Sequence, residues 1–346
     1  MQQDLKNIVV TGLAAISAAG VGVEPLVAAV RTGNSCLSAV PETVAGGERQ
    51  KWGRAEQFRA ADFMPPLKAR KFDRCSLFAV VAAGQALASA GLAKGALPPE
   101  RIGITIGAGF CGIANSEEFL SGYFRMGVDG LSPMLFPNTV ANAAASNASI
   151  EHGLQGPNVT AVQRFCSAES ALQLACRFLE EGRADVMVTG GVDELTPRML
   201  QGFRALRQDR NLAAGFGEGC GMLVLENREH AESRGATILG EVTTINSIGR
   251  LVAGRETEAV RLLLPASAPA RIGLSGTADL WPALEAALPD VARLNLTPIT
   301  GRSLAMGGLA MAALVATLES GDTALHLAAS PEGPYYAIAF HGGAPA

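Results

Sequence analysis

The stretch from Gly156 to Gly191 constrains the fold more than any other part of the chain. A Gly-Pro turn is followed by β-branched residues at 158–162, and apolar residues then recur at helical spacing over 167–179. A short apolar run at 185–188 ends at a Gly-Gly pair and suits a strand that is buried on both faces. Strand and helix patterns alternate in the same way along the whole chain, in two successive halves. This alternation predicts a layered α/β/α/β/α protein.

Cys166 lies where the first of these strands leads into the helix. Free backbone N–H groups and the helix dipole stabilise negative charge at such a junction, which makes it a common place for a nucleophile. A nucleophilic Cys166 is therefore the first functional hypothesis. The six cysteines are scattered and form no C-x-x-C pair, which indicates a cytoplasmic protein with reduced thiols.

The length of 346 residues suits one large α/β unit or two similar halves. We expect an N-terminal half at 1–235 and a C-terminal half at 236–346, together forming one compact unit. The net charge of −4 and the lack of a basic block argue against a nucleic acid partner. Residues 1–7 are polar and show no signal-peptide pattern, and the apolar run at 304–318 is too short to cross a bilayer. No membrane association is expected.

Residues 107–112 read G-A-G-F-C-G, which is a literal G-x-G-x-x-G. The nucleotide-binding interpretation needs a strand before the motif, a helix after it and an acidic residue about 20 positions on, where Asp129 lies nearby. The motif is not in the first βαβ unit, however, and a lone match is weak evidence. We interpret it as a tight backbone turn and expect neither a cofactor nor a metal site.

The segment from Glu117 to Met126 is amphipathic, and its bulky side includes Phe119, Tyr123 and Met126. Bulky aromatic residues on a helix are usually part of the core, which is our first interpretation. A subunit interface or a pocket wall is the alternative.

Several motifs, taken together, resemble those of the β-ketoacyl-ACP synthases of the thiolase fold. In chain order they are I-V-V-T-G, R-K-F-D, an S-P before an Asn/Ala-rich helix, A-D-V-M-V-T-G-G, G-F-G-E-G-C-G-M-L-V-L-E and I-T-G-R-S-L-A-M-G-G. Their order and spacing hold over nearly the whole chain. The resemblance implies a dimer of five-layered αβαβα subunits. Active members use a Cys nucleophile, two His residues and a nearby Lys to condense an acyl group with malonyl-ACP after decarboxylation.

The resemblance places the nucleophile position of the family on Phe165. Counting residues without gaps from three shared motifs gives this position each time. The motifs are Ser132-Pro133, Gly156-Pro157 and, counting backwards, Gly190-Gly191. One step along a helix turns a side chain by about 100°, so we expect Cys166 to point away from the pocket. A shift of one residue, which would bring Cys166 into the nucleophile position, is the alternative.

The other family positions also differ from active members. The first His corresponds to Ser275 in S-G-T, the second His to Arg302 in T-G-R, and the Lys falls near Thr297. None of the four histidines of the chain fits a catalytic position. Phe165 has no nucleophilic atom, Ser275 cannot replace an imidazole near pH 7, and Arg302 stays protonated. We therefore expect that the condensation chemistry is lost.

The second half departs from the family in two further ways. The glycine-rich gate loop between the last two strands appears as S-P-E-G-P at 330–334, where two prolines stiffen the loop and remove backbone donors. Little sequence lies between Gly249 and Ile272, and between Gly321 and Ala324. We therefore expect a shortened second half.

With these departures, the chain is most similar to the chain length factors, the ketosynthase β-subunits of type II polyketide systems. Such a subunit pairs with a catalytic ketosynthase and shapes the tunnel into which the acyl chain extends. The resemblance thus implies a heterodimer that works with acyl carrier protein, in a polyketide or polyene pathway. Phe119, Tyr123 and Met126 are the tunnel and interface candidates.

Two alternatives remain open at this point. One is a divergent, active β-ketoacyl synthase, acyltransferase or hydrolase that uses Cys166. The other is a non-catalytic assembly protein that recruits acyl carrier protein without controlling chain length. Carrier proteins are acidic, and a basic cluster of Arg198, Arg204, Arg207 and Arg210 suits such a partner, although a solvated charged face is the simpler interpretation.

Overall fold

The computed structural model describes residues 2–45, 50–206, 215–249, 254–276, 280–331 and 333–343. Within these residues, most of the strands join one large sheet, and a small sheet is formed by β3, β4 and β8. The strands are β1 (Gln2–Ser17), β2 (Gly20–Val21), β3 (Ser38–Ala39), β4 (Lys51–Gly53), β5 (Ile102–Ala108), β6 (Asn158–Ala161), β7 (Val186–Asp193), β8 (Phe216–Gly217), β9 (Gly219–Asn227), β10 (Gly240–Ile248), β11 (Arg271–Gly276), β12 (Ala292–Asn295), β13 (Thr323–Ala329) and β14 (Tyr335–Gly342).

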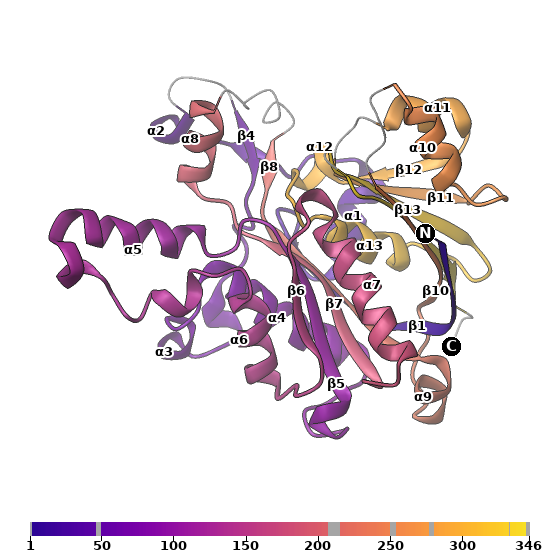
Figure 1. Cartoon of the computed structure of the whole chain (residues 1–346), viewed down its shortest axis with the longest axis horizontal. Helices are drawn as coiled ribbons and strands as arrows, with labels where there is room; N and C mark the ends of the chain where they lie inside the picture. The colour runs from indigo at the N-terminus through magenta and orange to yellow at the C-terminus, as the bar shows by residue number, and fades with distance from the viewer. Residues whose placement is uncertain are drawn as a thin grey trace.

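Helices connect these strands and cover their faces (Figure 1). The α-helices are α1 (Val23–Thr32), α2 (Glu42–Ala45), α3 (Pro66–Ala69), α4 (Arg74–Ser89), α5 (Ile113–Met126), α6 (Ala143–His152), α7 (Ser167–Glu180), α8 (Pro197–Ala205), α9 (Arg228–Ser233), α10 (Glu256–Leu263), α11 (Trp281–Ala287), α12 (Thr297–Thr300) and α13 (Gly307–Ala316). Short 3-10 turns lie at η1 (Ala60–Asp62), η2 (Pro99–Arg101), η3 (Gly127–Gly130), η4 (Phe136–Asn138) and η5 (Arg164–Cys166).

The two halves of the chain repeat the same strand order. In the first half the strands lie in the order β1-β9-β7-β5-β6, and in the second in the order β10-β14-β13-β11-β12. In both, the first strand in sequence is followed by the fifth, the fourth, the second and the third. β1 and β10 pair with each other, so the halves meet at their first strands. The prediction of two similar halves, with the second shortened, is confirmed. We propose that the boundary lies near residue 235, between α9 and β10.

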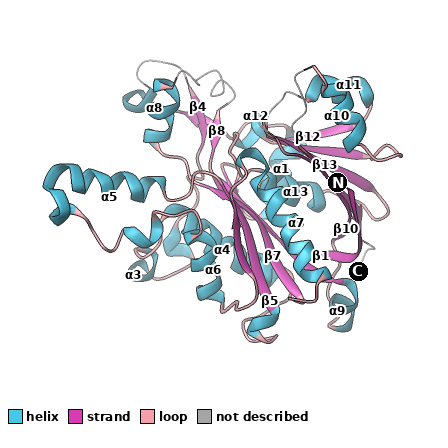
Figure 2. Cartoon of the chain, viewed as in Figure 1, coloured by secondary structure: helices cyan, strands magenta, loops and turns pink. Residues whose placement is uncertain are grey.

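Figure 2 shows helices on the faces of the large sheet, and this packing forms the layers. α4 packs its buried face on the first-half strands in one apolar cluster. α7 and α13 lie between the two halves of the sheet, in a second cluster shared with β9 and β14. α10 and α11 cover the outer face of β11, β13 and β14. The result is the five-layered αβαβα arrangement expected from the sequence.

Local sequence patterns predict the positions of several of these helices and strands. The sequence predicts a helix over 23–32 that stops at Gly33-Asn34; α1 has these bounds, and Gly33 adopts the left-handed conformation typical of a helix C-terminus. The sequence around P-E-G-P at 331–334 predicts a terminal hairpin, which β13 and β14 form by pairing in antiparallel fashion. The sequence also predicts a strand at 8–11, and β1 is longer than this. It extends because its early residues pair with β10 while Ile8 to Ile16 also pair with β9.

The core interpretation of the 117–126 segment is wrong. α5 contains no buried residue, and Tyr123 and Met126 are 45% and 65% exposed. Figure 1 shows that α5 projects away from the layered body, so its bulky side meets no other layer among the described residues. Phe119 is half-buried, and its ring lies 5.8 Å from the ring of Phe136. The alternative prediction of an interface helix therefore remains.

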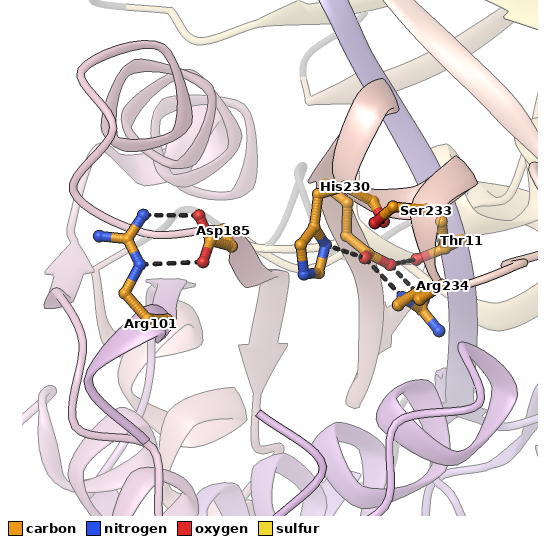
Figure 3. Close-up of polar contacts among 7 residues, drawn as sticks. Thr11, Arg101, Asp185, His230, Ser233 and Arg234 are labelled. Carbon is orange, nitrogen blue, oxygen red and sulfur yellow. Dashed lines mark hydrogen bonds and ion pairs between the residues drawn. The ribbon is translucent and has the colours of Figure 1, made fainter. Parts of the chain in front are cut away.

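Two ion pairs tie the lower ends of the first-half strands together (Figure 3). Glu226, fully buried on β9, accepts hydrogen bonds from Arg234 at 2.5 and 2.8 Å, from the hydroxyl of Thr11 and from His230 at 2.8 Å. Arg101 and Asp185 form a second, bidentate pair that is about one-third exposed. Among the described residues, no helix is long and apolar enough to cross a membrane.

Candidate functional site

The site predicted from the sequence lies at the junction between β6 and α7. After β6 the chain turns through η5, where Arg164 has a φ of 51°. The hydroxyl of Ser167 accepts the N–H of Gln163 at 2.9 Å and donates to the carbonyl of Arg164 at 2.7 Å. This local bonding closes the turn before the helix begins. The junction also packs against β11 and β13 of the second half, so residues of both halves meet here.

The structure brings Phe165 and Arg302 together. The Arg302 guanidinium lies 5.3 Å from the centroid of the Phe165 ring and 5.6 Å from that of Phe216. The backbone of Arg302 is fixed by hydrogen bonds with Gly215 and Gly217, at 3.1 and 2.9 Å. A cation over an aromatic face is stabilised by about 0.5–2 kcal/mol, more when it is shielded from water. The cation is therefore held between two rings at this position.

Cys166 is fully buried at the start of α7. Its thiol donates to the carbonyl of Pro334 at 3.1 Å. Burial raises the pKa of the Cys166 thiol well above its ordinary value, and the nearby Glu169 carboxylate raises it further. Because the thiolate is the nucleophile, these surroundings oppose nucleophilic attack by Cys166.

Ser275 belongs to a buried polar cluster that the sequence did not reveal. Its hydroxyl donates to Glu169 Oε1 at 2.8 Å, and the Nε2 atom of His326 lies 2.7 Å from the same oxygen. The Ser275 Oγ atom lies 3.3 Å from His326 Nε2, and each of the three residues in the cluster is at most 2% exposed. His326 comes from β13, which pairs in parallel with the strand of Ser275. An imidazole thus lies beside the predicted first-His position but is supplied by the neighbouring strand.

The geometry of this cluster suits hydrogen bonding within the core. Glu169 Oε1 accepts from both partners, and the Nε2 atom of His326 is already engaged. A Cβ atom at Gly307 would lie 1.9 Å from Glu169 Oε1, so the first residue of α13 packs directly on the carboxylate. With no exposed face, the cluster cannot take a proton from a substrate held outside it. A carboxylate among the small and apolar residues of the first turn of α7 was the one sequence signal that could have located it.

The remaining predicted residues lie apart from the Phe165 and Arg302 pair. Thr297 begins α12, is half-buried and donates its N–H to Asn295 within its own turn. The tunnel candidates lie on the projecting α5 (Figure 1). In the predicted basic cluster, Arg198 forms an ion pair with Glu117 at 2.8 Å. Arg207 and Arg210 lie outside the described residues.

The glycine motif at 107–112 binds carboxylates of the protein itself. The N–H groups of Gly109 and Phe110 donate to Asp193 Oδ1 at 2.9 and 2.6 Å. The Ala114 N–H donates to Glu194 Oε1 at 3.0 Å. A Cβ atom at Gly109 would lie 2.3 Å from Leu304, which explains the glycine. Burial raises the pKa of Asp193 to about 6 although these donors oppose the rise. Because the donors are occupied, the geometry favours the tight-turn interpretation.

Comparisons with known proteins agree with the fold and the motifs. A family model described as "Beta-ketoacyl synthase, N-terminal domain" matches residues 5–231. The 3-oxoacyl-[acyl-carrier-protein] synthase 2 of Synechocystis is 32% identical over 255 residues, which is 68% of this chain and 61% of that protein. The protein of the same name from Vibrio cholerae is 31% identical over 262 residues, 70% of this chain and 63% of that protein. The chain thus covers less than two thirds of these relatives' length.

Solved structures show the same architecture. "The ishigamide ketosynthase/chain length factor" has a TM-score of 0.83 at 22% identity and covers 98% of this chain and 100% of that one. A β-ketoacyl synthase from Burkholderia phymatum has a TM-score of 0.82 at 19% identity and covers 98% and 100%. The fold therefore defines a thiolase-like, ketosynthase-type protein. The match over residues 5–231 shows that the chain belongs to the β-ketoacyl synthase family.

Proposed function

We propose that this chain is a chain length factor, a catalytically inactive ketosynthase-like subunit of a type II polyketide or polyene pathway. It pairs with an active ketosynthase and shapes the acyl tunnel of the heterodimer. The observation that carries this proposal is the Phe165 ring lying under the Arg302 guanidinium. In this proposal the pair occupies the positions where an active relative holds its nucleophile and its second imidazole.

The chemistry of the site supports an inactive subunit. The benzyl group of Phe165 cannot attack a thioester, and an arginine held between two rings stays charged and cannot act as a base. Ser275 and Thr297 replace the first imidazole and the lysine in the same proposal. The neighbouring thiol of Cys166 is buried and has a raised pKa, which disfavours the alternative of a divergent enzyme that uses it.

The projecting α5 supports the pairing part of the proposal. Its exposed apolar side chains include Leu120, Tyr123, Phe124 and Met126, and the described part of the chain leaves all four uncovered. Exposed apolar surface of this kind usually marks a protein interface. β6 lies at the open edge of the sheet. We propose that the catalytic ketosynthase covers this side, as a partner of the kind named in "The ishigamide ketosynthase/chain length factor".

The mechanism that we propose is steric. Phe119, Tyr123 and Met126 bound the tunnel of the partner, and a longer chain cannot enter because a close-packed wall leaves no space for it. Acyl carrier protein delivers the substrate to the partner, and a solved complex of another system holds a "type II PKS acyl-carrier protein in complex with its ketosynthase bound to the hexaketide". All six cysteines are free, which fits a role in the reducing cytoplasm.

Co-expression with a catalytic ketosynthase tests the proposal. Condensation of malonyl-ACP is measured for the purified chain alone, for the ketosynthase alone and for the two together. We expect activity and a defined product length only for the pair. Condensation by the chain alone would show that it is an enzyme. If the pair forms but no substitution on α5 changes the product length, the chain acts only as a scaffold.

A further inference from the structure

A second polar cluster lies at the base of α5, away from the predicted site. Asp73 is the N-cap of α4 and Cys75 is in its first turn, while Glu194 follows β7. One ligand atom from each of these three residues lies within 4.8 Å of the other two. All three residues are at most 4% exposed. Cys111, in the turn that leads to α5, is also buried; its thiol donates to the carbonyl of Val192 at 3.5 Å, and it is close enough to Cys75 for each thiol to affect the pKa of the other.

Among the described residues, neither Asp73 nor Glu194 forms an ion pair, although Arg54, Arg74 and Arg125 line the same cavity as Glu194. Arg74 reaches the region but binds Glu218 in a bidentate pair at 2.6 and 2.8 Å, and Arg54 contacts the same carboxylate at 3.4 Å. One oxygen of Glu194 accepts the Ala114 N–H, and the other is buried with no hydrogen-bond partner in the described part of the chain. Two carboxyl groups buried this close together need either a proton or a cation between them.

We propose that Asp73, Cys75, Cys111 and Glu194 bind one zinc ion. Two thiolates and two carboxylates are ligands that Zn²⁺ accepts in tetrahedral geometry, whereas Mg²⁺ and Ca²⁺ bind oxygen and do not select thiolates. Ligands at about 2.0–2.3 Å from zinc lie about 3.5 Å from one another, so Asp73, Cys75 and Glu194 are already near the required spacing, and Cys111 is the proposed fourth ligand. The Asp73 carboxylate also accepts the N–H of Ser76 at 3.2 Å as the cap of α4, so its position at the cluster is fixed by the helix.

The position of this zinc site gives it a structural role. It joins the start of α4, the turn before α5 and the end of β7, and Glu194 also bonds the first turn of α5. Glu194 also lines a cavity of about 460 Å³ together with Arg54, Arg74 and Arg125. Zinc would therefore fix the direction in which α5 projects. This site was not expected from the sequence, because its ligands come from separate elements without a C-x-x-C pair.

The test uses the full-length chain, free of any affinity tag, in a reductant that does not bind zinc. The chain is treated with a chelator, incubated with ZnCl₂, desalted and analysed for metal content. We expect about one zinc ion per chain and a higher melting temperature with zinc than without. Cobalt chloride replaces zinc in a second sample, where thiolate ligands give a sulfur-to-cobalt charge-transfer absorption.

Two variants and one control decide the outcome. Glu194→Gln keeps the shape of the side chain and should lose most of the bound zinc, and Cys75→Ala should lose the charge-transfer absorption as well. Cys176→Ala removes another fully buried thiol outside the cluster and should bind as the wild type does. Absence of stoichiometric zinc in the wild type, or equal binding by Glu194→Gln, would overturn the proposal. In that case the two carboxyl groups share a proton.

Discussion

The guanidinium of Arg302 lies 5.3 Å from the centroid of the Phe165 ring, and these two residues come from different halves of the chain. The contact joins the β6–α7 junction to the segment that follows α12. In our proposal, a working ketosynthase holds a nucleophile beside a base in the same space. Here it holds a ring beneath a permanent cation, and this pair is the basis of the first prediction.

Restoring the nucleophile alone will not restore condensation. In Phe165→Cys the new thiol lies beside Arg302, which stays protonated and cannot act as a base, so we expect malonyl-ACP consumption by the isolated chain to stay at background. The measurement is product formation by mass spectrometry, with Cys166→Ala as the control that removes the neighbouring thiol. Turnover by Phe165→Cys would show that the other replaced positions are not limiting.

Cys166 should resist alkylation in the folded chain. Its pKa is raised by burial and by Glu169, so the reactive thiolate is scarce at neutral pH. We expect iodoacetamide to modify half-buried Cys36 much faster than Cys166, as measured by peptide mass spectrometry over time. Raising the pH to about 9 should increase labelling of Cys36 first, because its thiol is less deeply buried. Faster labelling of Cys166 than of Cys36 would favour the divergent-enzyme alternative.

Shortening the side chains on α5 should lengthen the products of the heterodimer. Phe119→Ala and Met126→Ala remove bulk from the proposed tunnel wall, and each should shift the product distribution toward longer chains. Leu262→Ala is the matched control, since Leu262 is 44% exposed on α10 at the far side of the molecule. Product lengths are compared by mass spectrometry. A shift with Leu262→Ala as well would point to a general loss of stability.

The two ion pairs in Figure 3 should differ in their contribution to stability. Arg234→Gln leaves the fully buried Glu226 without its bidentate partner, and we expect a loss of about 3 kcal/mol in the free energy of unfolding. Arg101→Gln breaks a partly exposed pair and should cost about 0.2–1 kcal/mol. Urea unfolding near neutral pH measures both losses.

The effect of Arg234→Gln should depend on pH. Burial raises the pKa of Glu226, but the hydrogen bonds from Arg234, Thr11 and His230 outweigh it and leave the pKa below the ordinary 4.5. The stabilisation from this carboxylate is therefore present above the ordinary pKa and is lost as the pH falls through the lowered pKa. The difference between wild type and variant should shrink in that acidic range. A constant difference would mean that Arg234 acts through packing alone.

The sequence predicted those features that depend on local patterns. The helices α1 and α7 and the terminal hairpin follow from periodicity and from glycine or proline positions. The exposure of α5 could not be predicted. An amphipathic pattern shows that one side of a helix is apolar, but it does not show whether the same chain or a partner chain buries that side. The contact between Glu169 and His326 joins residues 157 positions apart, so it forms only because the start of α7 packs against β13 of the second half.

The close approach of Gly307 to the Glu169 carboxylate has a consequence for related sequences. A methyl group at 307 would overlap the carboxylate oxygen, so an alanine there requires Glu169 to move away from Ser275 and His326. We expect homologues that keep this hydrogen-bonded acid to keep the glycine, and those with a short apolar residue at 169 to accept alanine at 307. Correlated substitution at these two positions in an alignment would identify the relatives that contain the same buried carboxylate.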